Sequence, residues 1–175
     1  MNILITGVQN PVEESIIKIA VERIEAKAKI RLLSFSDFMD DAESLRDELK
    51  LLKNTQKKIR DNVQMKVIKG SGHFILNGYF TVKTKLGYFP VITGAVMEVL
   101  KPDIIVHIAV DPLALEGKID NQESFRMHQS AERVVALSMA AASGAGVKII
   151  SCGIDESRKA SDELYDLLKN LVVKK

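Results

Sequence analysis

The sequence lacks the features of a secreted, membrane or nucleic-acid-binding protein. Its single cysteine, Cys152, excludes an intramolecular disulfide framework. It shows no N-terminal leader and no apolar run of about 18 or more residues, so we expect a cytoplasmic protein without a membrane partner. Aromatic residues make up only 5% of the chain and the basic residues form no long run, so nucleic acid is not indicated as a partner.

What the sequence does contain is typical of an ordinary globular protein. Hydrophobic residues make up 46% and charged residues 27%, with both signs spread along the chain and a net charge of +2. A length of 175 residues suits one domain, residues 1–175, around a single core.

Apolar runs and helical patterns alternate along the chain, which predicts an α/β fold. The run at 103–110 is almost continuously apolar, as expected of a central parallel strand covered on both faces. Strands are predicted at 2–6, 30–35, 74–76, 103–110 and 147–152.

The segments between these strands predict the crossover helices that a parallel sheet requires. Helical spacing predicts helices over 12–27, after Pro11, and over 123–144. A final helix over 156–173 has Asp155 as its expected cap. Residues 41–69 predict two amphipathic helices, inserted between the second and third strands.

The turn between the first strand and the first helix occupies the place of a phosphate-binding loop. A loop of the form G-x-x-x-x-G-K-[ST] needs its second glycine for close backbone approach and its lysine for charge. Gly7 is present, but Val12 and Glu13 replace that glycine and lysine, and a carboxylate would repel a polyphosphate. Two interpretations of Glu13 and Glu14 stay open: favourable acids in a first helical turn, or a site for a cation or basic ligand.

Four parts of the sequence together resemble archaeal-type adenylate kinases. They are the N-terminal strand, turn and helix, the segment Thr-Val-Lys-Thr-Lys-Leu-Gly-Tyr-Phe-Pro at 81–90, Lys-Pro-Asp-Ile-Ile at 101–105, and Gly-Ala-Gly-Val-Lys-Ile-Ile at 144–150. The resemblance spans nearly the whole chain and implies a P-loop kinase-like, three-layer αβα fold with a five-stranded parallel sheet. It also implies a monophosphate-binding helical insertion at about 36–70, a shortened lid at about 111–124, and a homo-oligomer, with a trimer suspected.

The phosphate-binding loop departs furthest from the family pattern. The family's loop resembles G-x-P-G-x-G-[KG]-T-T, whereas this chain has Gly-Val-Gln-Asn-Pro-Val-Glu-Glu-Ser at 7–15. Two inner glycines are lost, and of the hydroxyl residues only a serine remains. The resemblance leaves these vestigial nucleotide-binding candidates: Gly7, Gln9, Asn10, Val12, Glu13 and Ser15.

The acceptor side is altered as well. Asp37 either caps a helix or keeps a ligand contact. The segment that begins at Arg46 resembles a family motif, with Lys50 where a phosphate-binding arginine would be, so the charge remains without the bidentate fork. A second family arginine falls on Met65.

Further candidates follow the third strand. Asn77 replaces an acid near magnesium, and an amide cannot supply that negative charge. Lys83 and Tyr88 belong to the retained 81–90 segment, which shapes either a monophosphate pocket or a structural turn.

The lid and the helix after it carry little positive charge. Residues 111–125 contain no arginine and one base, Lys118. Arg126 and Arg133 face either the cleft or the helix surface. Among the remaining candidates, His107 is expected to be a satisfied core residue and Cys152 a lone buried thiol, and no histidine has metal-ligand spacing.

These losses predict an adenylate-kinase-like protein that lacks efficient phosphotransfer and acts in nucleotide-related binding, regulation or interaction. The alternative is a weak or altered nucleoside-monophosphate kinase that uses Lys50, Lys83 and Arg126, with Mg-ATP as its cofactor only in that case.

Overall fold

The computed structural model describes residues 1–35, 49–68, 70–85 and 87–173. Its main sheet is fully parallel, with the strand order β2-β3-β1-β6-β7. The five strands are β1 (Asn2–Gly7), β2 (Ile30–Ser34), β3 (His73–Gly78), β6 (Ile104–Val110) and β7 (Gly146–Cys152). The predicted five-stranded parallel sheet is therefore confirmed, with strand ends shifted by one or two residues.

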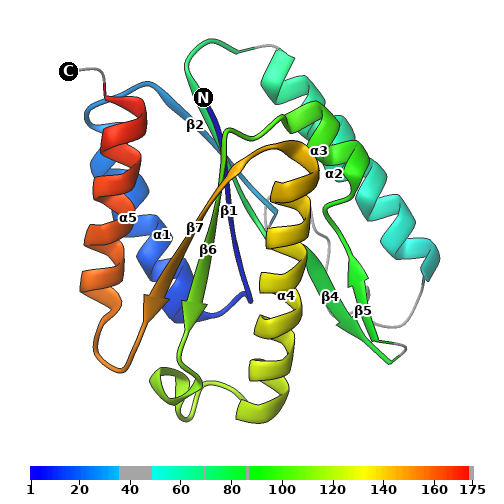
Figure 1. Cartoon of the computed structure of the whole chain (residues 1–175), viewed down its shortest axis with the longest axis vertical. Helices are drawn as coiled ribbons and strands as arrows, with labels where there is room; N and C mark the ends of the chain where they lie inside the picture. Colours follow the sequence, from blue (N-terminus) through cyan, green and yellow to red (C-terminus); the bar gives the residue numbers. More distant parts are fainter. Residues whose placement is uncertain (36–48, 69, 86, 174–175) are drawn as a thin grey trace.

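Helices cover both faces of this sheet, which gives the predicted three-layer αβα arrangement (Figure 1). One core cluster lies between the sheet and helices α1 and α5. The other lies between the sheet and helices α2, α3 and α4. The helices are α1 (Pro11–Glu25), α2 (Leu49–Ile68), α3 (Gly94–Leu100), α4 (Gln122–Ser143) and α5 (Ser157–Val172). In the described part of the chain, no helix is both long and apolar enough to cross a bilayer.

Residues 81–90 form a separate antiparallel hairpin, β4 (Thr81–Thr84) and β5 (Gly87–Pro90). This segment carries the Thr-Val-Lys-Thr motif, but its two strands were not predicted from the sequence. In Figure 1 the hairpin lies toward the end of the molecule at which β6 and β7 finish. The N-terminal end of α4 lies at that same end of the molecule.

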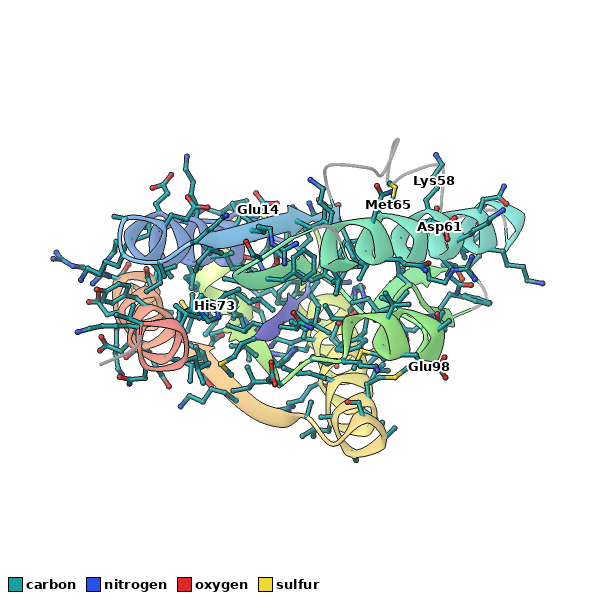
Figure 2. All side chains as sticks on the ribbon, turned by 90° about the horizontal axis from the view of Figure 1, so that it is seen from above. Glu14, Lys58, Asp61, Met65, His73 and Glu98 are labelled. Carbon is teal, nitrogen blue, oxygen red and sulfur yellow. The ribbon has the colours of Figure 1, made fainter. Side chains whose placement is uncertain are left out.

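The insertion after β2 is described only in its second part. There it is the single helix α2, whose apolar residues Leu52, Ile59 and Val63 are buried. The first of the two predicted helices lies outside the described residues. Met65 is 51% exposed, and Figure 2 shows it with Lys58 on the outer side of α2.

The predicted Asp155 cap of the last helix is wrong. Asp155 adopts a left-handed conformation, with φ of 57°, one residue before the actual cap position. Glu156 occupies that position, and its Oε2 accepts a hydrogen bond from the Gly153 N–H at 3.1 Å. Aspartate tolerates the left-handed region better than most residues, which explains its place in this turn.

Candidate functional site

A cleft opens at the carboxyl ends of the parallel strands, where α/β sheets bind ligands. Its volume is about 800 Å³. The loop after β1, the β4–β5 hairpin and the first turns of α4 line it. A smaller cavity of about 80 Å³ lies between the loop after β1 and the ends of β2 and β3. Gln9 and Tyr79 line both spaces, so the two adjoin.

Asn10 caps the first helix with its own side chain. Its Oδ1 accepts hydrogen bonds from the N–H groups of Val12 at 3.0 Å and Glu13 at 2.9 Å. Its Nδ2 donates to the Val8 carbonyl at 2.6 Å, and the residue is buried. The free N–H groups of a helix N-terminus are what binds an anion. Here the Asn10 amide oxygen already occupies two of them.

Replacing Asn10 with alanine is expected to lower the free energy of unfolding by about 1 kcal/mol, the usual cost of losing an N-cap. Urea denaturation of the full chain measures the change. Gln9→Ala is the matched control, because Gln9 is exposed and bonds only to the exposed Glu14 in the described structure. It is expected to change stability by less than about 0.5 kcal/mol. Equal losses in the two variants would contradict the capping role.

The Glu13 side chain lies over Gly7. A Cβ atom added to Gly7 would stand 2.6 Å from Glu13 Oε1. Glu13 is only 4% exposed, and its pKa is raised to about 8 by burial and then by the charges of Glu132 and Glu14. The interpretation of both acids as favourable first-turn charges is therefore wrong for Glu13 and remains suitable only for the exposed Glu14.

Helical spacing explains why Glu13 turns inward. Glu13 lies three and four residues before the buried Ile16 and Ile17, on the face of α1 that packs against the sheet. The same spacing was readable from the sequence. Because charged residues are seldom fully buried, burial of Glu13 was not among the two interpretations that the sequence left open.

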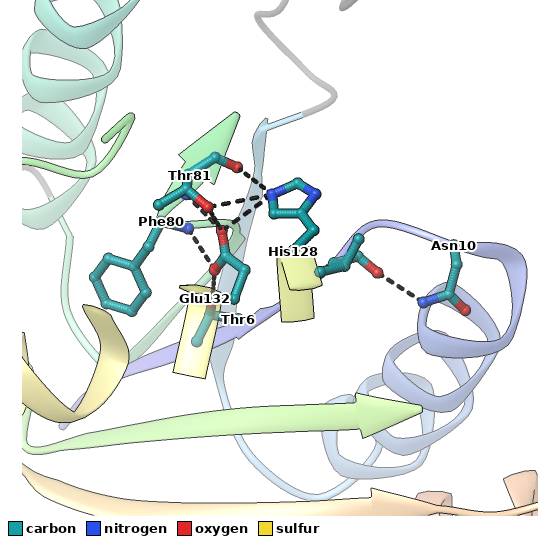
Figure 3. Close-up of polar contacts among 7 residues, drawn as sticks. Thr6, Asn10, Phe80, Thr81, His128 and Glu132 are labelled. Carbon is teal, nitrogen blue, oxygen red and sulfur yellow. Dashed lines mark hydrogen bonds and ion pairs between the residues drawn. The ribbon is translucent and has the colours of Figure 1, made fainter. Parts of the chain in front are cut away.

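Glu132 of α4 is a buried acid that the sequence analysis missed. Its Oε2 accepts from Thr6 Oγ1 at 3.1 Å and from the Phe80 N–H at 2.9 Å. Its Oε1 accepts from the N–H of Thr81 and, at 2.6 Å, from Thr81 Oγ1. Figure 3 shows these bonds joining β1, α4 and the start of the hairpin. Helical spacing could have predicted the burial of Glu132, because it lies four residues before the buried Ala136.

Two opposing effects act on the pKa of Glu132. Burial raises its pKa, while the four hydrogen bonds lower it. The Tyr79 hydroxyl responds to the same carboxyl, since burial and then the charge of Glu132 raise the pKa of Tyr79 to about 12. A second buried acid thus lies behind the cleft wall, bonded to the cleft-lining Thr81.

The hairpin docks on α4 through its polar and aromatic side chains. Lys83 Nζ donates to Ser124 Oγ at 2.5 Å. The Tyr88 ring stacks on His128 with ring centroids 5.1 Å apart, and His128 Nε2 lies 3.2 Å from the Thr81 carbonyl oxygen. The predicted candidates Lys83 and Tyr88 are therefore both near the cleft wall, and Lys83 lines it.

The other predicted candidates are less close together. Asn77, at the end of β3, lines the small cavity with Gln9 and Glu13. Val12 is half-buried, and Ser15 is exposed on α1. Asp37 and Arg46 lie outside the described residues, as does the side chain of Lys50.

The two arginines of α4 are exposed. Arg126 lies 3.9 Å from Glu123, which places it on the helix surface. Arg133 is exposed as well. Neither lines the larger cleft, whose lining bases include Lys83 and Lys85.

His107 and Cys152 are core residues, as predicted. Within the described residues, however, neither ring nitrogen of His107 has a hydrogen-bond partner, so the expectation of a satisfied histidine is wrong. Burial and then the charge of Arg133 lower the pKa of His107 to about 4, which keeps the ring neutral. Burial raises the pKa of the Cys152 thiol, with a further contribution from Glu156.

Known proteins match this chain over most of its length. A model of the AAA domain family matches residues 18–134. An adenylate kinase of Pyrococcus furiosus is 30% identical over 95% of this chain and 94% of its own length. The chain belongs to the archaeal-type adenylate kinase family. The adenylate kinase of Pyrococcus horikoshii is 29% identical over 98% of this chain and 96% of its own length. That of Methanopyrus kandleri is 31% identical over 72% of this chain and 74% of its own length.

Family membership fits the observed sheet and gives the loop its context. The turn from β1 to α1 is the segment whose sequence was compared above with the family's phosphate-binding loop. At this place the chain carries the buried Asn10 amide and the buried Glu13 carboxyl. At the start of α1, two N–H groups are thus bonded to Asn10, and the Glu13 carboxyl lies beside Gly7.

Proposed function

We propose that this adenylate kinase family member lacks efficient ATP:AMP phosphotransfer and serves in ligand binding or regulation. One observation carries the proposal. The Glu13 carboxyl lies directly over Gly7, where a phosphate group would have to approach the backbone. Phosphate could enter only if this side chain left its buried position and the Asn10 cap opened.

The charge around the cleft argues in the same direction. Phosphoryl transfer depends on positive charge and positioning, because the protein has little covalent chemistry to perform. Here the loop offers an acid, the buried Glu132 lies behind Thr81 of the cleft wall, and Asn77 stands where an acid near magnesium is expected. The described residues therefore do not fit Mg-ATP as a substrate. Losing one preorganised donor costs about 2.7–4 kcal/mol, and several losses act together here.

The space for a ligand nevertheless remains. The cleft of about 800 Å³ is of the size that takes a small molecule, and its hairpin wall is held on α4 by the Lys83 and Tyr88 contacts. A retained cleft beside a loop that carries the buried Glu13 favours binding over catalysis.

A coupled assay with Mg-ATP and AMP tests the proposal. Kinases commonly turn over at roughly 1–100 s⁻¹. We expect turnover at least about 10³-fold below that range, since each lost donor accounts for about 10²–10³-fold. The adenylate kinase of Pyrococcus furiosus, assayed identically, is the positive control. Turnover of this chain within about tenfold of that control would contradict the proposal, because each tenfold in rate is only about 1.4 kcal/mol.

A further inference from the structure

The small cavity that adjoins the cleft is lined by six polar residues together with Phe35 and Gly78. The polar residues come from three elements and from the loops after β1 and β3. Its volume of about 80 Å³ exceeds the roughly 30 Å³ that one water occupies in the liquid and leaves room for a head group of a few atoms. The polar residues around it are Gln9, Glu13, Glu14, Ser34, Asn77 and Tyr79.

Glu13 makes this cavity unusual. Its carboxyl lines the space and is 96% removed from solvent, at 4% exposure. Within the described residues no hydrogen bond reaches that carboxyl, since the Gln9 amide donates to Glu14 instead. A buried acid without a partner is costly in its charged form, so Glu13 favours the protonated form unless a cation pairs with it.

Among the described residues, the charged groups that act on Glu13 are acids. Glu14 on α1 and Glu132 on α4 both act on it, while β2 and β3 contribute the uncharged Ser34 and Asn77. Such a surrounding repels an anion and attracts a cation. Among the described residues no group of three or more acid, histidine or cysteine side chains could hold a metal ion. Hard divalent cations need a larger set of oxygen ligands than this.

We propose that this cavity binds the ammonium group of a small primary amine, with the rest of the molecule in the adjoining cleft. The inference rests on the proposed loss of the phosphate site, because one position cannot serve both charges. The ammonium would pair with the Glu13 carboxylate and donate to the Asn77 and Ser34 oxygens. Gln9 and Tyr79 line the passage between the two spaces.

Pairing with the ammonium couples amine binding to the release of the Glu13 proton. The pKa of Glu13 is raised to about 8, so at neutral pH its carboxyl is mostly protonated before an amine arrives. An alkylammonium group keeps its charge up to a pH of about 10. Binding therefore releases the Glu13 proton, and affinity increases as the pH rises toward about 8.

Titration of the full chain with n-butylamine, followed by the side-chain amide NMR signals of Gln9 and Asn77, tests the site. The affinity is expected to be at least about tenfold higher at about pH 8.5 than at about pH 6. The neutral analogue n-butanol is expected to bind at least about tenfold more weakly, a difference of about 1.4 kcal/mol. Glu13→Gln should remove amine binding, whereas Glu22→Gln, on the exposed side of the same helix, should retain it.

Three results would overturn the inference: no amine binding at tens of millimolar, equal binding by Glu13→Gln, or displacement of the amine by MgCl₂ through binding to these residues. The kinase assay separates the two proposals. Ordinary turnover would defeat the proposed function itself. Absent turnover together with absent amine binding would defeat only the ammonium site.

Discussion

Replacing Glu132 with alanine is expected to lower the free energy of unfolding by roughly 3 to 5 kcal/mol, since each buried donor left unpaired costs about 1–3 kcal/mol. The Phe80 and Thr81 N–H groups both lose their acceptor, and both residues are buried. The Thr6 and Thr81 hydroxyls lose theirs as well. Removal of the side chain also leaves a cavity between α4 and the sheet.

Chemical denaturation of wild type, Glu132→Ala and Glu123→Gln measures this effect. Glu123 lies on the same helix but is exposed, so its variant is expected to stay within about 0.5 kcal/mol of wild type. Should Glu132→Ala lose less than about 1 kcal/mol, the carboxyl would not be the acceptor that joins the hairpin to β1 and α4.

Replacing Glu13 with glutamine is expected to stabilise the protein increasingly as the pH rises. The folded-state pKa of Glu13 is about 8, well above its ordinary value of 4.5, so the folded protein binds this proton more tightly than the unfolded chain. Stability of the wild type therefore falls between about pH 4.5 and 8 as Glu13 ionises. At about 1.4 kcal/mol per pKa unit, the cost above about pH 8 reaches at most about 5 kcal/mol.

Denaturation at about pH 5 and about pH 9 separates two effects on stability. One is the ionisation of Glu13, which depends on pH, and the other is any effect of the glutamine side chain, which does not. The difference in stability between Glu13→Gln and wild type should increase by several kcal/mol between these two conditions. Glu22→Gln, an exposed change on the same helix, should show almost no such increase. A constant difference for Glu13→Gln would mean that this carboxyl ionises normally and is not held over Gly7.

The sheet could be predicted from the sequence because its strands are strongly apolar. The run at 104–110, for example, is mostly buried, and its short length and β-branched residues favour a strand over a helix. The hairpin at 81–90 was missed, since its strands of four residues each carry no clear alternation.

The candidate site was predicted only in outline. The proposed loss of phosphate binding rests on Val12 and Glu13, but the burial of Glu13 was not predicted, because a helix-start acid is usually solvated. Glu132 was missed for a related reason. Its partners Thr6, Phe80 and Thr81 lie 126, 52 and 51 residues away, and such pairing depends on tertiary structure.

The central proposal is that the Asn10 and Glu13 side chains occupy the loop after β1 and keep phosphate out. Its most direct test is a crystal structure of the protein soaked with Mg-ATP. We predict that Asn10 keeps its hydrogen bonds to the Val12 and Glu13 N–H groups, that Glu13 stays over Gly7, and that no phosphate density appears at the start of α1. A triphosphate bound to those N–H groups, with the Glu13 side chain displaced toward solvent, would contradict the account.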